Sequence, residues 1–420
     1  MLYFLKTGKV KLPSLVYGIV LIVILMDCVF FNLIQVPAGL SIFWNEYNKL
    51  LPGIFCFVLF VVFTIVARSK EETQSSFVYM YVTLSAVSIL SVIFLSGIQY
   101  PDIGLLSFFI ETSHYWYLFL IMPLLYYFRK EDRGYEKIMG MLNVIALITY
   151  IVALVQSIAY DRSGLNFLTK ELTIQDDSIR MGIGCFGNVM ILYNIDKFYN
   201  GTEKRASTLL NAVLGVLAML LVQRTRGFAI VNILCIGAII LMNNRTIGKT
   251  FVNVLLIVGV VIYLVYSGIL TTLLESLNPE TGINIGIRLE AIKYFWKEFT
   301  QNMLYGHGLA IGPRYYSISR GPIGLFFYSD VGVIGSLAQY GLFYVVLYVW
   351  PMLHMGRIAV KWLCEKKARQ KYTFLIGVYI FLLLTSASLV VTDMFRMLLF
   401  PFCIAIFEYQ YADYLRQPEG

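Results

Sequence analysis

The sequence predicts an all-α membrane protein with about 12 transmembrane helices, and three observations lead to this prediction. First, 59% of the 420 residues are hydrophobic and only 14% are charged, whereas about a quarter of the residues in soluble domains are charged. Second, several apolar runs approach or exceed roughly 18 residues with almost no charge, which is long enough for a helix to cross a bilayer. Third, the cations gather in alternate connections between these runs, as they do in multi-pass membrane proteins.

Each long apolar run predicts one span of a single transmembrane domain that covers residues 1–420. The predicted spans are 14–35, 49–67, 77–97, 110–128, 138–158, 181–198, 207–223, 227–243, 251–270, 331–353, 373–391 and 395–413. The run at 181–198 is the weakest, because Asn188, Asn194 and Asp196 interrupt it. No internal repeat is evident, although many secondary transporters are built from two related halves.

The distribution of cations predicts the orientation of these spans. Lys6, Lys9 and Lys11 precede the first run, which is too long for the core of a typical signal peptide and is therefore predicted to be an uncleaved span. With these lysines in the cytoplasm, every cation-rich connection also lies there, and so do both termini. The protein is thus expected in the cytoplasmic membrane. The net charge of +8 reflects these short loops, which argues against a nucleic-acid partner.

The cysteines and histidines give no indication of a metal site. Five of the six cysteines lie within hydrophobic runs and none forms a CxxC pair, while the three histidines are far apart in the sequence. We therefore expect neither a metal nor another cofactor.

The longest extracytoplasmic connection, residues 271–330, is the most informative. Loops of this length are usually functional or disordered, and its aromatic residues, glycines and periodic pattern argue against disorder. Within residues 285–299, helical spacing relates Leu289, Ile292, Phe295, Trp296 and Phe299. This pattern predicts an amphipathic helix with its apolar face against lipid or the helical bundle. Arg288 shares that face, so it either binds a ligand or reaches the lipid headgroups.

Arg224 and Arg226 lie between two apolar runs and need a separate explanation. One helix over 207–243 would exceed the bilayer at 1.5 Å per residue, so the chain is expected to turn near Gln223–Gly227 on the outer side. A cation at the start of the next helix is unfavourable unless an anion lies opposite, because the helix N-terminus is already partly positive. The pair therefore predicts an anion site with phosphate as its natural ligand. The alternative is a pair of arginines that binds headgroups at the tip of a hairpin.

Further candidates follow in the outer connection. Gly306, Gly308 and Gly312 would let the backbone approach a ligand closely. Arg314 would add a positive charge, and Tyr315 and Tyr316 could stack on sugar rings. His307 is either a substrate-binding or a structural residue.

Two acids lie at the outer ends of later spans. Asp330 could take a proton from a sugar hydroxyl as a general base, or it could cap the following helix with Ser329. Asp393 is close in sequence to Arg396, and we expect these two to pair with each other rather than to contact substrate.

The order of these features resembles the bacterial O-antigen and capsular polysaccharide polymerase (Wzy) family, which is related to the O-antigen ligases within the GT-C-like glycosyltransferases. Arg226 and Gly237 match the arginine–glycine spacing of that family, and residues 288–308 resemble its loop signature. The resemblance covers residues 207–342. Ligases tend to carry a histidine before the span that follows the large loop, where this chain has Ser329–Asp330. That departure favours a polymerase.

The resemblance implies a function. A growing glycan on undecaprenyl diphosphate would be transferred to a lipid-linked oligosaccharide repeat unit, without a metal. Arg224, Arg226, Arg288 and Arg314 would bind the diphosphate, Arg288 would also serve catalysis, and Asp330 would act on the acceptor hydroxyl. A chain-length regulator and a flippase are the implied protein partners. An O-antigen ligase, or a flippase or other transporter of lipid-linked sugars, is the alternative. Alanine at Arg224, Arg226 or Arg288 would be expected to abolish long glycan chains.

Overall fold

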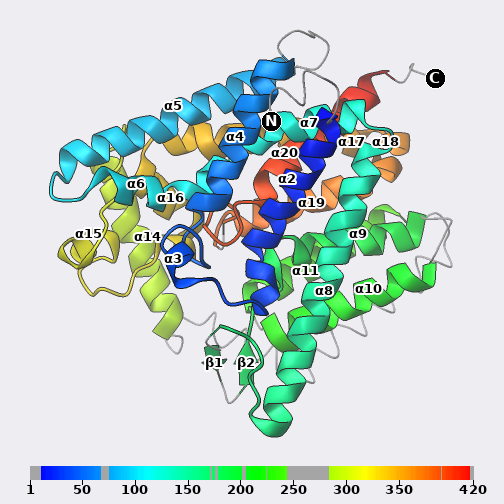
Figure 1. Cartoon of the computed structure of the whole chain (residues 1–420), viewed down its shortest axis with the longest axis horizontal. Coiled ribbons are helices and arrows are strands. Elements are labelled where there is room, and N and C mark those ends of the chain that lie inside the picture. Colours follow the sequence, from blue (N-terminus) through cyan, green and yellow to red (C-terminus); the bar gives the residue numbers. More distant parts are fainter. Residues whose placement is uncertain are drawn as a thin grey trace.

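The computed structural model describes residues 11–67, 75–170, 173–175, 178–200, 205–223, 225–243, 283–388 and 390–416. Helices account for most of this structure, as the sequence predicts, and Figure 1 shows them packed into one bundle. A short hairpin of two antiparallel strands, β1 (Thr173–Gln175) and β2 (Ser178–Arg180), is a feature that the prediction lacks.

Most predicted spans in the described ranges fall on helices, but 110–128 and 331–353 are each divided among several elements. The longer helices are α2 (Leu12–Asp27), α4 (Leu50–Ala67), α5 (Ser76–Gln99), α7 (Ile121–Lys130), α8 (Gly134–Ser163), α9 (Gly184–Asn200), α10 (Arg205–Ala218), α11 (Arg226–Met242), α14 (Ile283–Gln301), α16 (Gly332–Tyr340), α17 (Trp350–Cys364), α19 (Thr373–Thr385) and α20 (Leu399–Arg416). The predicted span 251–270 lies outside the described residues.

Short helices complete the connections. They are α3 (Ala38–Ser41), α6 (Leu105–Glu111), α15 (Tyr316–Ser319), α18 (Lys366–Lys371), the 3₁₀ helices Val29–Asn32, Ser113–Leu120, Pro313–Tyr315 and Tyr328–Val331, and the π-helical segments Met219–Gln223 and Val345–Val349.

Length and composition indicate a membrane protein. Three helical stretches in the described ranges are long and apolar enough to cross a bilayer: Ser76–Gln99, Gly134–Ser163 and Ala206–Gln223. Leu105–Glu111 and Ser113–Lys130 form a fourth candidate that is bent by 55°. Shorter apolar helices occupy Leu12–Asp27, Leu50–Val66, Gly227–Met242 and Thr373–Thr385. The full number of about 12 spans therefore stays a prediction.

The first span is shorter than predicted. The sequence predicts it over 14–35, but α2 ends at Asp27 and the chain then turns with positive φ at Phe30 and Phe31. Asp27 forms an ion pair with Lys49 from the following connection, so the chain must return toward α2 at this point.

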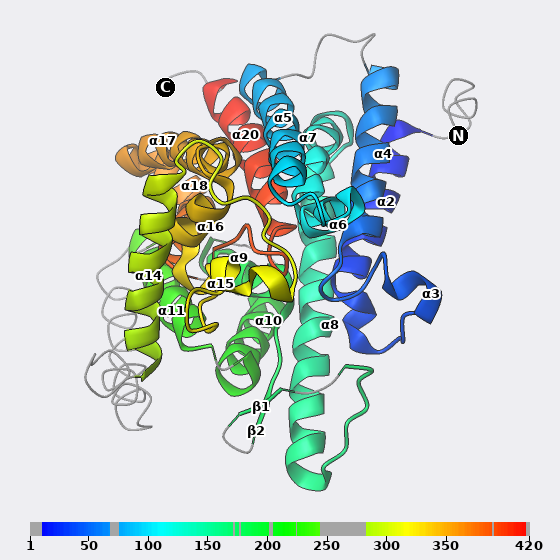
Figure 2. The same cartoon turned by 90° about the vertical axis from the view of Figure 1, so that its left-hand side faces the viewer.

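Both ends of the described chain lie on the same side of the bundle, as the predicted topology requires. Figure 2 shows the start of α2 and the end of α20 at the top, with the β hairpin and the end of α8 at the bottom. The connections that contain Lys49, Arg180 and Thr225 come together on the side of the hairpin. The assignment of that side to the extracytoplasmic space stays a prediction from the loop charges.

Close backbone approach and polar pairs hold the helices together. A Cβ atom on Gly377 of α19 would lie 2.7 Å from Ile239 Cδ1 of α11, so a larger residue there would force the Ile239 side chain to move. Asn232 of α11 donates to Asn188 of α9 at 2.9 Å, and Asn194 donates to Asn143 of α8 at 2.6 Å. The asparagines that weakened the prediction of the α9 span therefore join it to its neighbours.

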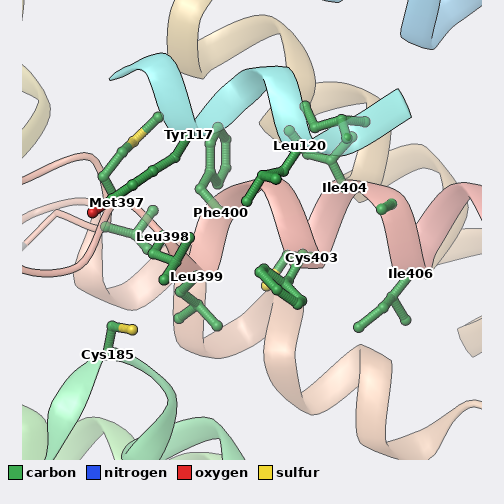
Figure 3. Close-up of a cluster of buried hydrophobic side chains, with 14 of the residues drawn as sticks. Tyr117, Leu120, Cys185, Met397, Leu398, Leu399, Phe400, Cys403, Ile404 and Ile406 are labelled. Carbon is green, nitrogen blue, oxygen red and sulfur yellow. The ribbon is translucent and has the colours of Figure 1, made fainter. Parts of the chain in front are cut away.

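The core of the bundle lies around α20. Figure 3 shows Phe400 of α20 beside the 3₁₀ helix that carries Tyr117 and Leu120. These three side chains are at most 1% exposed. This packing fixes the start of α20, where Leu399 lines the first of the two cavities described below.

The outer helix α14 packs on α16 through Ala291, Phe295 and Phe299. Trp296 is 50% exposed, beside this buried face rather than on it. Arg288, which was expected to begin the buried face, is exposed. The expectation was wrong because Ile287 and Ala291 form the buried face at this end of α14, and Arg288 is rotated by about 100° from Ile287.

Candidate functional site

A cavity of about 370 Å³ lies where the ends of several helices meet on the hairpin side of the bundle. Its lining includes residues at the ends of α2, α9, α11, α19 and α20, together with residues of α8. The charged residues that line it are Asp27, Glu46, Lys49, Lys170, Arg180 and Arg396. We call this space the cationic cavity, because four cations and two carboxylates leave a balance of +2.

The deepest charges of the cationic cavity are already paired. Lys49 Nζ lies 3.3 Å from Asp27 Oδ1, and their side chains are only 3% and 5% exposed. Tyr117 donates a hydrogen bond to Asp27 at 3.0 Å, and the Cys185 thiol lies 3.4 Å from the other carboxylate oxygen. Asp27 is therefore fully engaged and holds α2, the 3₁₀ helix Ser113–Leu120 and α9 together. Nearer the surface, Lys170 pairs with Glu46.

The hairpin places Arg180 in the cationic cavity. Met181 N donates to the Val222 carbonyl at 3.1 Å, which ties the end of β2 to the π-helical end of α10. Arg180 Nη2 then donates to Thr225 Oγ1 at 3.1 Å. The guanidinium thus contacts the turn between α10 and α11, the same turn in which the sequence places Arg224 and Arg226.

Arg396 brings a further cation to the cationic cavity from the connection between α19 and α20. Its Nη2 lies 3.4 Å from Asp393 Oδ2, so the pair expected from the sequence forms. The guanidinium also lies 5.5 Å from the centre of the Phe228 ring. Its Nε is buried without a hydrogen-bond partner in the described structure, as is Gln223 Oε1. A buried polar atom that lacks a hydrogen bond costs about 1–3 kcal/mol, and a polar ligand that bonded to it could recover this free energy.

The side chains, rather than the helix dipoles, set the sign of this cavity. The N-termini of α9, α11 and α20 border it, and so do the C-termini of α2, α10 and α19. Because the partial charges at the two kinds of helix end are opposite, their contributions largely offset each other. The excess of cationic side chains then favours an anion.

A second cavity of about 390 Å³ lies next to the first, and we call it the aromatic cavity. Its aromatic lining consists of Tyr115, Tyr316, Phe326, Phe327, Tyr328 and Tyr340. Its charged lining consists of Glu111, Asp393 and Arg320, which gives two carboxylates and one cation, a balance of −1. The two cavities therefore differ in both charge and lining.

The connection between α19 and α20 separates the two cavities. Val390, Thr392 and Asp393 line the aromatic cavity, whereas Phe395 and Arg396 line the cationic cavity. The Asp393–Arg396 ion pair thus lies at the boundary between them.

The structure gives limited information about the predicted arginine pair. Arg224 lies outside the described residues, and so does the side chain of Arg226, the first residue of α11. Their neighbours Gln223 and Thr225 both line the cationic cavity. The turn therefore borders an anion-compatible site, and whether the two guanidinium groups enter it stays a prediction.

The other predicted diphosphate ligands lie outside both cavities. Arg288 is exposed on α14 and lines neither of them. Arg314 also lines neither, and its 77% exposed side chain pairs with Asp102 at 3.2 Å. The Tyr315 hydroxyl donates to the same carboxylate, which lowers the pKa of Asp102 and raises the pKa of Tyr315. Arg314 and Tyr315 thus join the outer connection to the end of α5.

His307 and two of the glycines support the fold of the outer connection. The buried ring of His307 lies 3.0 Å from the Tyr328 hydroxyl through Nε2, and Tyr100 donates to the His307 carbonyl at 2.6 Å. Burial lowers the pKa of His307 to about 4. A Cβ atom on Gly308 would lie 2.8 Å from Ser96 Oγ of α5, and one on Gly306 would overlap the backbone of α16. These two glycines therefore let the connection pack closely against α5 and α16. Gly312 lines the aromatic cavity.

Tyr316 and Asp330 differ in position. Tyr316 lines the aromatic cavity, and the guanidinium of Arg320 lies 4.3 Å from the centre of its ring. Asp330 lies in the 3₁₀ turn before α16 and lines neither cavity. It also makes no side-chain capping bond to α16, which begins after Val331. In the structure, Asp330 therefore neither lines a cavity, as a general base for the substrate would, nor caps α16.

Sequence analysis missed seven charged residues of the two linings: Asp27, Glu46, Lys49, Lys170, Arg180, Glu111 and Arg320. Each is a single charged residue in a connection or at a helix end, where topology alone accounts for charge. Comparison with known proteins does not add to this picture, because the chain matches no family model and no curated protein.

Proposed function

We propose that the protein is a metal-independent glycosyltransferase of the polysaccharide polymerase type, acting at the outer face of the cytoplasmic membrane. It would transfer a growing glycan from undecaprenyl diphosphate to a lipid-linked oligosaccharide repeat unit. One observation carries the proposal: four cations from three separate connections between helices line one cavity beside the turn that contains Arg224 and Arg226.

The cationic cavity suits the diphosphate of such a donor. Arg180 and Arg396 are the two guanidinium groups that line this cavity, and Arg396 Nε is buried without a hydrogen-bond partner in the described structure. A planar guanidinium can bind two phosphate oxygens at once. Apolar residues such as Phe228, Phe381 and Leu399 line the same cavity and would accept the first part of a polyprenyl chain.

The reaction requires one bond to form and one to break. The acceptor hydroxyl oxygen attacks the anomeric carbon of the donor sugar, and the bond from that carbon to the diphosphate oxygen breaks with its electron pair. Cations at the diphosphate stabilise the negative charge that develops in the transition state. The hydroxyl proton passes to a carboxylate. Asp330 is the sequence-based candidate, and Glu111 and Asp393 are the carboxylates that line the adjoining cavity.

Reconstitution tests this proposal. Proteoliposomes with the purified protein, undecaprenyl-diphosphate-linked repeat units and EDTA are expected to give a ladder of longer glycans on a gel. Arg180→Gln and Arg396→Gln should each lose the ladder. Lys371→Gln is the matched control, because it removes a cation from an exposed pair with Asp413 that belongs to neither cavity. A normal ladder from both cavity variants would refute the proposed site.

The same vesicles separate the alternatives. A ligase would give a single transfer of the glycan to a different acceptor and no ladder among the repeat units. A flippase would move lipid-linked sugar between the leaflets without joining units. Either outcome would replace the polymerase proposal.

A further inference from the structure

We propose that the aromatic cavity is a binding subsite for an uncharged sugar residue, in which Glu111 accepts a hydrogen bond from a sugar hydroxyl. The inference deepens the proposed function, because it assigns the sugar part of the substrate to a cavity separate from the anion site. It rests on the shape, lining and charge of that cavity.

Glu111 is the most informative residue of the aromatic cavity. It ends α6 at the point where the bent pair of helices turns by 55°, so the break directs this side chain to the cavity instead of continuing the helix. Within the described ranges, its carboxyl group has no hydrogen-bond or ion-pair partner. Glu111 is partly exposed, so its carboxyl group can accept a hydrogen bond from a ligand in the cavity.

The other charged residues of the cavity are already engaged. Arg320 lies over the rings of Tyr316 and Phe327, at 4.3 and 5.4 Å from their centres. Asp393 accepts from the Phe395 backbone at 2.9 Å and pairs with Arg396. Glu111 is thus the lining carboxylate whose hydrogen-bonding capacity remains for a ligand.

The aromatic lining provides the apolar surface that a sugar ring requires. Pyranose rings present a face of C–H groups and an edge of hydroxyls, so flat aromatic rings and hydrogen-bonding side chains together match both. Tyr316, Phe327 and Tyr328 supply rings from the outer connection, and Tyr340 supplies one from α16. Polar side chains in the same lining are Ser319, Ser329, Ser336, Gln339 and Thr392.

Charge decides between ligand classes. The Asp393–Arg396 pair at the boundary is neutral as a whole, so Glu111 and Arg320 leave the aromatic cavity neutral, whereas the other charged residues of the cationic cavity keep an excess of one cation that favours an anion. An organic cation would also be attracted by aromatic rings, but Arg320 already supplies a positive charge in this cavity and would repel it. A sugar hydroxyl can donate to Glu111 without adding charge. The observations therefore favour a neutral, hydroxyl-rich ligand.

Saturation-transfer NMR on the full-length protein in nanodiscs tests this inference. The probes are free glucose, galactose and N-acetylglucosamine at millimolar concentration, with inorganic pyrophosphate as the probe of the cationic cavity. At least one sugar should receive saturation from the wild-type protein, and pyrophosphate should not compete with it. Glu111→Ala and Tyr316→Ala should each reduce the sugar signal about tenfold, since a hydrogen bond to a charged group is worth about 1.5–3 kcal/mol.

The matched control is Tyr305→Ala, which removes an exposed tyrosine of the same connection that lines neither cavity. Tyr316 is 40% exposed, so its alanine variant should fold even if the Glu111 variant does not. Absence of any sugar signal in the wild-type protein would overturn the inference, and so would equal signals in the Tyr305 and Tyr316 variants. Tetramethylammonium binding in place of sugar would assign the cavity to a cation.

The result is separate from that of the polymerase assay. Sugar binding that depends on Glu111 and Tyr316, without formation of a glycan ladder, would support the subsite and refute the polymerase. A ladder that forms normally in both variants, with no sugar binding, would support the polymerase and refute the subsite.

Discussion

The buried ion pair of Asp27 and Lys49 gives the sharpest test of the structure around the cationic cavity. The two charged atoms are 3.3 Å apart and their side chains are almost fully buried. At that distance and an effective dielectric constant of about 20, their attraction is about 5 kcal/mol. Removing one partner of such a pair costs about 3–5 kcal/mol, because the other charge stays buried without compensation. Lys49→Met should therefore destabilise the protein strongly.

Thermal unfolding in detergent, followed by tryptophan fluorescence, measures this effect. Asp27→Asn combined with Lys49→Met should be more stable than Lys49→Met alone, because no uncompensated charge remains. Lys137→Met is the control. Its pair with Glu131 is exposed by 47% and 32%, so its loss should cost less than about 1 kcal/mol. The reasoning fails if Lys49→Met unfolds no earlier than Lys137→Met, or if the double variant is the least stable of the three.

Two further predictions concern packing and pH. Gly377→Val should lower stability by about 1–3 kcal/mol, because its side chain would collide with Ile239. Gly140→Val, whose Cβ meets nothing within 4 Å, should not, and equal melting temperatures would contradict the α11–α19 contact. For His307, burial lowers the pKa to about 4 in the folded state, so the unfolded chain takes up a proton first as the pH falls below about 6.5. Stability should fall by up to about 3 kcal/mol between about pH 6.5 and pH 4. His307→Gln should show a smaller fall in melting temperature over this range, and an identical fall would show that another group titrates.

Hydrophobic run length was sufficient to predict most helices. The predicted span 49–67 corresponds to α4 at Leu50–Ala67, and 77–97 corresponds to α5 at Ser76–Gln99. In a bilayer, the backbone N–H and C=O groups of such a run find no water to bond with and must form hydrogen bonds within the segment. A long apolar run therefore predicts a helix. The break after Glu111 was not predicted, because the sequence there has no proline or glycine to mark it.

The candidate site was harder to predict because it depends on contacts between distant segments. The turn at Gln223–Gly227 was identified by its charges, and Gln223 and Thr225 of this turn line the cationic cavity. Arg180 could not be placed there, since its position depends on a short hairpin and on the bond from Met181 to Val222. Conversely, Arg288 and Arg314 matched the expected chemistry but lie outside both cavities. Residue type indicated the chemistry, whereas tertiary contacts determined which residues share a site.

The central claim is that the cationic cavity binds a polyprenyl diphosphate, and the most direct test is the dissociation constant for undecaprenyl diphosphate in nanodiscs. We predict that Arg180→Gln and Arg396→Gln each raise this constant about tenfold or more, because each removes a charged hydrogen bond worth about 1.5–3 kcal/mol. Lys371→Gln should leave it unchanged. Wild-type affinity in both cavity variants would contradict the claim.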